Sequence, residues 1–92
     1  MKSTTMILTS AIALFALPLH AAVTVGDVIG TTETDIRTAL ESSGYVVESI
    51  EMEDDEIEVE TRFDGKAFEI ELSASTGAVL EIEAEDKDDD DD

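Results

Sequence analysis

Acidic side chains are the most abundant groups in this chain that could take part in chemistry. The sequence holds 24 aspartates and glutamates against five lysines and arginines, with one histidine, His20, and no cysteine. Acid–base catalysis needs a positioned proton donor and acceptor, and covalent catalysis needs an activated nucleophile. Carboxylates spread along a chain meet neither requirement. We therefore expect a protein with no catalytic residues and no cofactor.

The net charge restricts the partners of the chain. At −19 it is repelled by nucleic-acid phosphates and anionic lipids, whereas cations, basic peptides and basic proteins are attracted. Hard divalent cations prefer carboxylate oxygens, but the sequence has no calcium loop punctuated by glycine. We expect weak, delocalised cation binding and no specific metal site. The terminal segment 83–92 is too acidic to bury and is expected to be a disordered tail, either solubilising or attractive to a basic partner.

Residues 1–21 have the features of an export signal. Lys2 lies near the terminus, an apolar run covers residues 6–17, and small residues follow. Cleavage after Ala21 is favoured and cleavage after Ala22 is the alternative. The run is too short to span a bilayer, so an uncleaved anchor is less favoured and no membrane span is expected after cleavage. Cleavage would remove Lys2 and His20, and loss of the lysine would change the net charge to −20. The expected product is a periplasmic or secreted protein.

A lead-in segment at 22–30, with a short extended piece at 23–25, is followed by a predicted helix of roughly three turns. Thr32 is a candidate N-cap, with Asp35 at the third helical position, and Gly44 is a stop signal. The apolar residues at helical spacing are Ile36, Ala39 and Leu40.

After the helix the apolar spacing changes to strict alternation, which predicts three half-buried strands. The apolar residues of one parity are Val46, Ile50 and Met52, then Ile57, Val59, Thr61 and Phe63, then Phe68, Ile70 and Leu72. A turn at 53–56 can join the first two strands so that Met52 faces Ile57 and Ile50 faces Val59. A further turn at Ser75-Thr76-Gly77 leads to a fourth short strand through Val79, Leu80 and Ile82.

Asp64-Gly65 is a favoured type I′ turn, and it fixes the register of the second hairpin by pairing Phe63 with Lys66. A slip of one residue would move every buried side chain to the water side. In this register four carboxylates share the face opposite the apolar one. They are a candidate surface for weak cation binding or for a partner: Glu58 opposite Glu71, and Glu60 opposite Glu69. The predicted fold class is α+β, with one N-terminal helix packed on a three- to four-stranded antiparallel meander.

The segments GYVVESIE, VETRFDGKAFE and TGAVL, in this order and spacing, resemble the PepSY domain family over residues 31–82. The resemblance implies a small exported module of the kind found in peptidase propeptides and proposed to restrain peptidases. It brings no catalytic residues. The family usually has an aspartate where this chain has Ser73, while Thr76 and Gly77 are retained. Serine can still accept a hydrogen bond from a nearby amide, so the turn is expected to form.

Two functions follow as expectations. The first is a non-catalytic PepSY-like module that binds a protein, either a peptidase that it modulates or a basic protein. The alternative is an acidic protein of the cell envelope that binds and buffers cations such as calcium.

Overall fold

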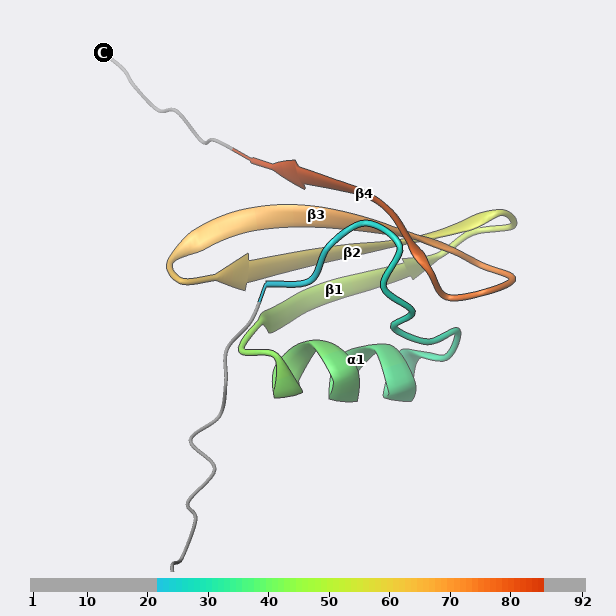
Figure 1. Ribbon diagram of the computed structural model, residues 1–92, viewed down its shortest axis with the longest axis horizontal. Helices are drawn as coiled ribbons and strands as arrows, with labels where there is room; N and C mark the ends of the chain where they lie inside the picture. Colours follow the sequence, from blue (N-terminus) through green and yellow to red (C-terminus); the bar gives the residue numbers. More distant parts are fainter. Residues whose placement is uncertain (1–21, 86–92) are drawn as a thin grey trace, which may run out of the picture.

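The computed structural model describes residues 22–85, so the predicted signal peptide and residues 86–92 of the predicted tail lie outside it. Its elements in chain order are α1 Glu33–Ser42, β1 Val46–Met52, β2 Glu56–Phe63, β3 Lys66–Ser73 and β4 Val79–Ala84. The strands form one antiparallel sheet in the order β1-β2-β3-β4, with α1 beside β1 (Figure 1). The predicted α+β meander is confirmed. β4 continues past the boundary suggested at Ile82, to Ala84.

Helix α1 begins and ends where its cap residues predict. The Thr32 hydroxyl accepts a hydrogen bond from the Asp35 amide at 3.1 Å, which satisfies one of the free donors of the first turn. At the other end Gly44 has a φ of +98°, the left-handed conformation that glycine tolerates best. Ile36 and Leu40 are fully buried and fasten the helix to the sheet.

The second hairpin has the predicted register along its whole length. Phe63 lies opposite Lys66, and the pairs Val59–Ile70 and Ile57–Leu72 follow on the apolar face. Positive φ values at both turn residues, +56° at Asp64 and +82° at Gly65, are those of a type I′ turn. In the first hairpin the predicted pairs Ile50–Val59 and Met52–Ile57 are also present.

The start of β1 differs from the prediction. A bulge between Val47 and Ser49 adds a residue to this strand and reverses the parity before it. Val47 is therefore the side chain that enters the core, at 9 % exposed, whereas Val46 is 59 % exposed. The expectation that Val46 shares the apolar face is wrong, because strict alternation does not survive the extra residue.

The lead-in segment forms hydrogen bonds with the beginning of β4. Val28 bridges Ala78, the Gly26 amide donates to the Val79 carbonyl, and the Val79 amide donates to the Asp27 carbonyl. Nearer the N-terminus, the buried Val23 amide donates to the Tyr45 hydroxyl at 3.1 Å. The extended pairing thus lies after residues 23–25. It joins the start of the described chain to β4, at the edge of the sheet.

The turn before β4 is held by the residues that the sequence singles out. The Ser73 hydroxyl accepts from the Thr76 amide, and the Thr76 hydroxyl accepts from the Ala78 amide, both at 3.2 Å. Gly77 has a φ of +78°, and a Cβ placed on it would lie 2.6 Å from the Gly30 carbonyl oxygen. The turn forms without the family's usual aspartate, as predicted, and Gly77 is where the lead-in segment approaches it most closely.

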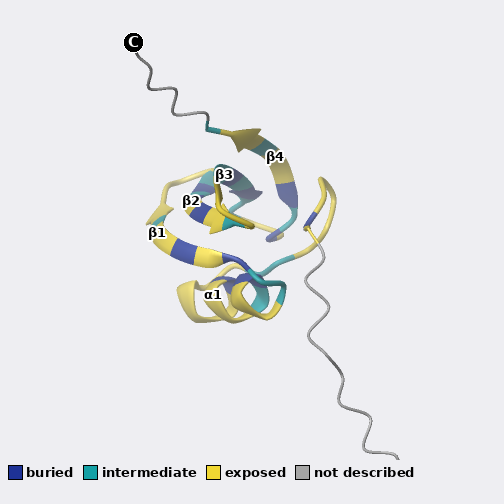
Figure 2. Ribbon diagram, turned by 90° about the vertical axis from the view of Figure 1, so that its left-hand side faces the viewer, coloured by how far each residue is buried: buried dark blue, intermediate teal, exposed yellow. Residues whose placement is uncertain are grey.

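The core lies between the apolar face of the sheet, the helix and the lead-in segment. Buried residues recur along β2 and β3 and on the inner side of α1 (Figure 2). Tyr45 is buried and stacks on the half-buried Phe63 ring, with their centroids 4.4 Å apart. The members of the core cluster are Val23, Ile36, Leu40, Tyr45, Val47, Ile57, Val59, Ile70, Leu72 and Val79.

Candidate functional site

The face of the sheet opposite the apolar face carries mainly glutamates, and we call it the carboxylate face. The pairs Glu58–Glu71 and Glu60–Glu69 lie opposite each other, as the turn register predicts. The outer strands extend both rows, because Glu81 lies opposite Glu71 and Glu83 lies opposite Glu69. Its members are Glu51 on β1, Glu56, Glu58 and Glu60 on β2, Glu69 and Glu71 on β3, and Glu81 and Glu83 on β4.

The outer members of this face were not among the residues predicted from the sequence. Glu51 could have been found, because the predicted register of the first hairpin places it opposite Glu58. The positions of Glu81 and Glu83 could not be predicted, because β4 has a register shift next to Leu72 for which the sequence carries no signal. The carboxylate face is consequently wider than the four predicted residues.

Carboxylate oxygens meet in three groups on or beside this face, each with ligand atoms within 4.8 Å of one another. Such groups offer the hard oxygen ligands that calcium and magnesium take. They also repel each other, and exposed acidic groups often lie together without a metal ion. The groups are Glu51, Glu53 and Glu58; Glu56, Glu58 and Glu71; and Glu60, Glu69 and Glu85.

Crowding on this face shifts the ionisation of its carboxyl groups. Partial burial on the sheet raises the pKa of Glu71 to about 7, with repulsion from Glu56 and Glu81 adding to the effect. Partial burial also raises the pKa of Glu69, and the negative charge of Glu58 contributes. The charge that Glu71 contributes to this face therefore changes with pH near neutrality.

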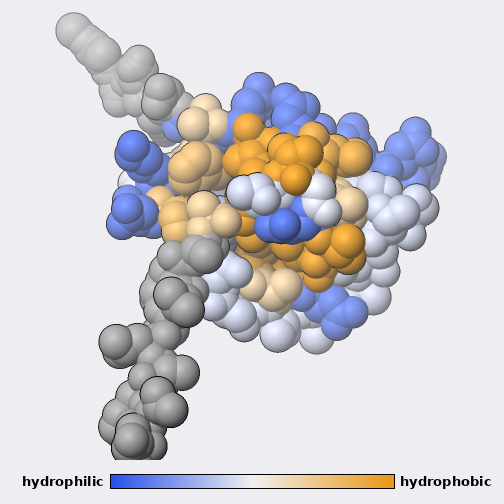
Figure 3. All heavy atoms as spheres, viewed as in Figure 1, coloured by the Kyte–Doolittle hydropathy of each residue, from blue (hydrophilic) through white to orange (hydrophobic). Residues whose placement is uncertain are grey.

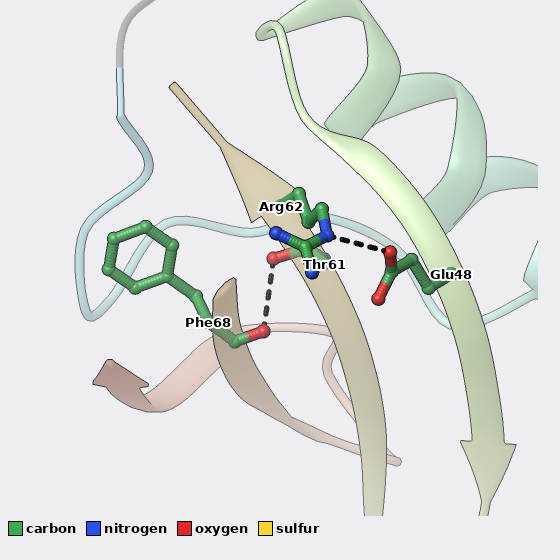
Figure 4. A network of polar contacts seen from close by, with 4 residues as sticks. All are labelled: Glu48, Thr61, Arg62 and Phe68. Carbon is green, nitrogen blue, oxygen red and sulfur yellow. Dashed lines mark hydrogen bonds and ion pairs between the residues drawn. The ribbon is translucent and has the colours of Figure 1, made fainter. Parts of the chain in front are cut away.

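Neighbouring residues on β2 show how differently the two faces are used (Figure 4). Thr61 is buried on the apolar face, and its hydroxyl donates to the Phe68 carbonyl at 3.1 Å. Arg62 has the parity of the glutamates, and its Nε donates to a Glu48 carboxylate oxygen at 3.0 Å. Both members of this ion pair are about half exposed, so it adds little stability.

The five predicted turn residues are placed at two ends of the sheet. Asp64 and Gly65 close the β2–β3 hairpin, whereas Ser73, Thr76 and Gly77 shape the connection to β4. The Ser73 hydroxyl lies 3.2 Å from the Ser75 hydroxyl and accepts from the Thr76 amide. These contacts hold the turn together, at the end of the carboxylate face where Ser73 lies opposite Glu56.

Comparison with known proteins identifies the domain. No curated protein and no solved structure matches the chain. None of the helical structure in residues 22–85 has the length and apolar character that a bilayer crossing requires. Residues 1–83 match the family described as peptidase propeptide and YPEB domain, PepSY_2. PepSY domains are generally non-catalytic propeptide or regulatory modules, typically extracellular or periplasmic. Because the match covers most of its length, the chain belongs to the PepSY family of peptidase-propeptide-like modules.

Proposed function

We propose that this protein is an exported, non-catalytic module that binds another protein and modulates a peptidase in the periplasm or outside the cell. The single observation that carries the proposal is the family match over residues 1–83. The chemistry of the chain agrees with it, because a protein without cysteine, whose one histidine is His20, has few groups for catalysis.

The carboxylate face gives the proposed interaction its electrostatic character. A surface carrying one sign of charge attracts partners of the opposite sign and raises their rate of encounter. Arg62 is the only basic residue of the strand pairs on this face within residues 22–85, and Glu48 already pairs with it. We expect the partner to present a basic surface, either on a peptidase or on another exported protein.

The proposal is tested by adding the purified protein to peptidases from the exported fraction of the same cells. We expect a saturable change in the rate of one peptidase and no peptide cleavage by the protein alone. Glu60→Gln with Glu69→Gln should weaken the effect, whereas Glu33→Gln with Glu41→Gln removes the same charge from α1 and should not. A set of peptidases whose rates never change, with no saturable capture of any of them, contradicts the proposal.

Export is part of the proposal and has its own measurement. The apolar run at 6–17 supports it, since this run has the length of a signal core. We expect the intact mass of the protein from the exported fraction to correspond to residues 22–92, or to 23–92 for the alternative cleavage site. A protein found only in the cytoplasm at full length would contradict it.

Cation binding is the second candidate, and the three groups of carboxylate oxygens within 4.8 Å favour it. Calorimetry with calcium chloride separates it from the first candidate. Binding with fixed stoichiometry that is lost in Glu58→Gln with Glu71→Gln, but kept in Glu33→Gln with Glu41→Gln, would support a cation-binding protein. Weak heat without a defined stoichiometry would leave the protein-binding module as the account of this chain.

A further inference from the structure

The outer edge of β4 is open over most of its length. The lead-in segment covers the beginning of the strand through the contacts of Gly26, Asp27 and Val28 with residues 78 and 79. From Leu80 to Ala84 no other part of residues 22–85 pairs with this edge, because β4 is the last strand of the sheet. In Figures 1 and 2 no described element lies along the end of β4 on the side away from β3.

The hydrogen-bonding groups on this edge can be assigned from the register. The Glu85 amide donates to the Ala67 carbonyl of β3, so the backbone N–H group of Glu85 points toward β3. Because backbone groups alternate in direction along an antiparallel strand, the N–H and C=O groups of Glu81 and Glu83 also point toward β3. The N–H and C=O groups of Ile82 and Ala84 therefore point outward, where an added strand would meet them.

The two sides of this edge have different chemistry. Glu81 and Glu83 are exposed on the carboxylate face. On the other side lie the half-buried Ile82 and the exposed Ala84, opposite Ile70 and Phe68 of β3. Apolar surface also gathers on the face that carries the lead-in segment (Figure 3). Val28 is 70 % exposed beside the start of β4, and Leu80, where the open edge begins, is 51 % exposed.

The other edge of the sheet, β1, is a poorer template. Its bulge between Val47 and Ser49 lies within the strand and interrupts the regular spacing of its backbone groups, which resists strand addition. The register shift of β4 falls between Val79 and Glu81, at the start of the open edge, so the backbone groups from Glu81 to Ala84 keep their regular spacing. Helix α1 also packs against this strand. A second copy of the chain is an unfavourable partner for β4. Antiparallel pairing of two such strands would place Glu81 and Glu83 opposite the same glutamates of the other copy, and like charges directly opposite are destabilising.

We propose that the open edge of β4, from Leu80 to Ala84, binds an extended segment of a partner protein in which basic and apolar residues alternate. The segment adds a fifth strand that runs antiparallel to β4. Its basic side chains lie beside Glu81 and Glu83, and its apolar side chains cover Ile82 and Ala84. This inference rests on the proposed function as a protein-binding module, and it specifies the surface and the class of partner.

The register makes one demand on the bound segment that can be tested chemically. Residues directly opposite in neighbouring strands point to the same face, and the outward groups of β4 belong to its apolar-face residues, Ile82 and Ala84. In an antiparallel fifth strand, the residue directly opposite Ile82 or Ala84 exchanges hydrogen bonds with it, so the partner's apolar residues must present their N–H groups to β4. Its basic residues must present theirs to the solvent.

The experiment uses the protein from the exported fraction and a fluorescent short peptide in which lysine and valine alternate. We expect this peptide to bind about tenfold more tightly than a peptide of equal composition with its lysines grouped, or one with glutamate in place of lysine. Backbone N-methylation of the valines should abolish binding. N-methylation of the lysines should leave it. Equal binding of the alternating and grouped peptides, or insensitivity to valine methylation, overturns the proposal.

Two matched variants place the peptide on one edge of the sheet. Glu81→Lys with Glu83→Lys reverses the charge beside β4 and should weaken binding about tenfold. Glu51→Lys with Glu53→Lys makes the same change at the end of β1 and in the turn that follows it, and should have a much smaller effect. Urea unfolding of both variants checks that each is folded. Equal losses in the two variants mean that only overall charge is sensed, which contradicts the proposed edge.

Amide hydrogen exchange gives the last readout. In the free protein the amides of Ile82 and Ala84 should exchange faster than those of Glu81 and Glu83, and the bound peptide should slow them. Slowing at Ile50 and Met52 instead would place the peptide on β1 and overturn the proposal. Slow exchange at Ile82 in a free dimer would assign the edge to a second copy. If Glu81→Lys with Glu83→Lys still modulates a peptidase fully, the proposed function survives and this inference fails.

Discussion

The apolar face and the carboxylate face of the sheet are carried by the same strands, yet they act on stability in opposite directions. Ile70 is fully buried and the next residue, Glu71, lies among carboxylates on the other side. Burial of an aliphatic side chain contributes about 1.5–3 kcal/mol, whereas like charges directly opposite on a sheet are destabilising. The contrast indicates that the apolar face stabilises the fold, whereas repulsion between the glutamates of the carboxylate face opposes it.

Replacement of Ile70 by alanine should break the apolar side of this comparison most severely. Ile70 is fully buried, so its truncation removes buried methyl groups and leaves a cavity, and we expect a loss of about 2–5 kcal/mol in the free energy of unfolding. Urea unfolding measures it. Glu83→Ala, on the neighbouring strand and exposed, is the control and should change stability little. A loss at Ile70 no larger than that of the control would mean that this face is not the core.

Gly77→Ala tests the contact that brings the lead-in segment against the apolar side of the fold. The new Cβ would lie 2.6 Å from the Gly30 carbonyl oxygen on a residue with positive φ, so we expect a loss of about 3 kcal/mol. Gly65→Ala has the same kind of φ but open space around it, and it should cost about 1 kcal/mol. Thermal unfolding compares the two. Similar losses would show that the backbone conformation matters and the close approach does not.

The regular part of the fold could be predicted from the sequence because turn chemistry and alternation agree. Asp64-Gly65 allows one register, and that register places Ile57, Val59 and Thr61 on one face, as the structure confirms. The same register places Glu58 opposite Glu71 and Glu60 opposite Glu69. Local signals sufficed there, since each pair of strands is joined by a short turn.

Irregular features could not be predicted, because tertiary packing decides them. The bulge near Glu48 lets Val47, and not Val46, enter the core, and two adjacent valines carry no sign of which will do so. The pairing of Val28 with Ala78 joins segments far apart in the chain and depends on the close approach of Gly77 and Gly30. The register shift of β4 next to Leu72, which places Glu81 and Glu83 on the carboxylate face, is likewise without a signal in the sequence.

Acidification should reduce the difference between the two faces. The folded-state pKa of Glu71 is raised to about 7, and that of Glu69 is also raised, so above the ordinary glutamate pKa of 4.5 the native state binds more protons than the unfolded chain. The stabilisation of the native state by proton binding to these two carboxyl groups is fully present below about pH 4.5, and it is lost as the pH rises through about 7. The melting temperature should therefore rise as pH falls from about 8 toward 5. A midpoint that falls over this range would contradict the crowding of these carboxyl groups.

Sodium chloride should have a smaller effect in the same direction. At about 0.15 M the Debye length is about 8 Å, so repulsion between glutamates on neighbouring strands is screened only in part. We expect a modest rise in melting temperature at about pH 8 and almost none near pH 4.5. Calcium chloride at matched ionic strength gives the comparison. A calcium effect far larger than that of sodium, removed by Glu58→Gln with Glu60→Gln, would favour the cation-binding candidate.

The stability of Glu71→Gln at two pH values tests the central claim most directly, because this change removes one charge from the carboxylate face and nearly preserves the shape of the side chain. In urea unfolding at about pH 8 the variant should be more stable than the parent protein by a few tenths to about 1 kcal/mol, as expected for an exposed like-charge contact. Near pH 4.5 the two proteins should be almost equal. A variant that is less stable than the parent at about pH 8, or that differs by the same amount at both pH values, would contradict the claim that the carboxylate face opposes folding.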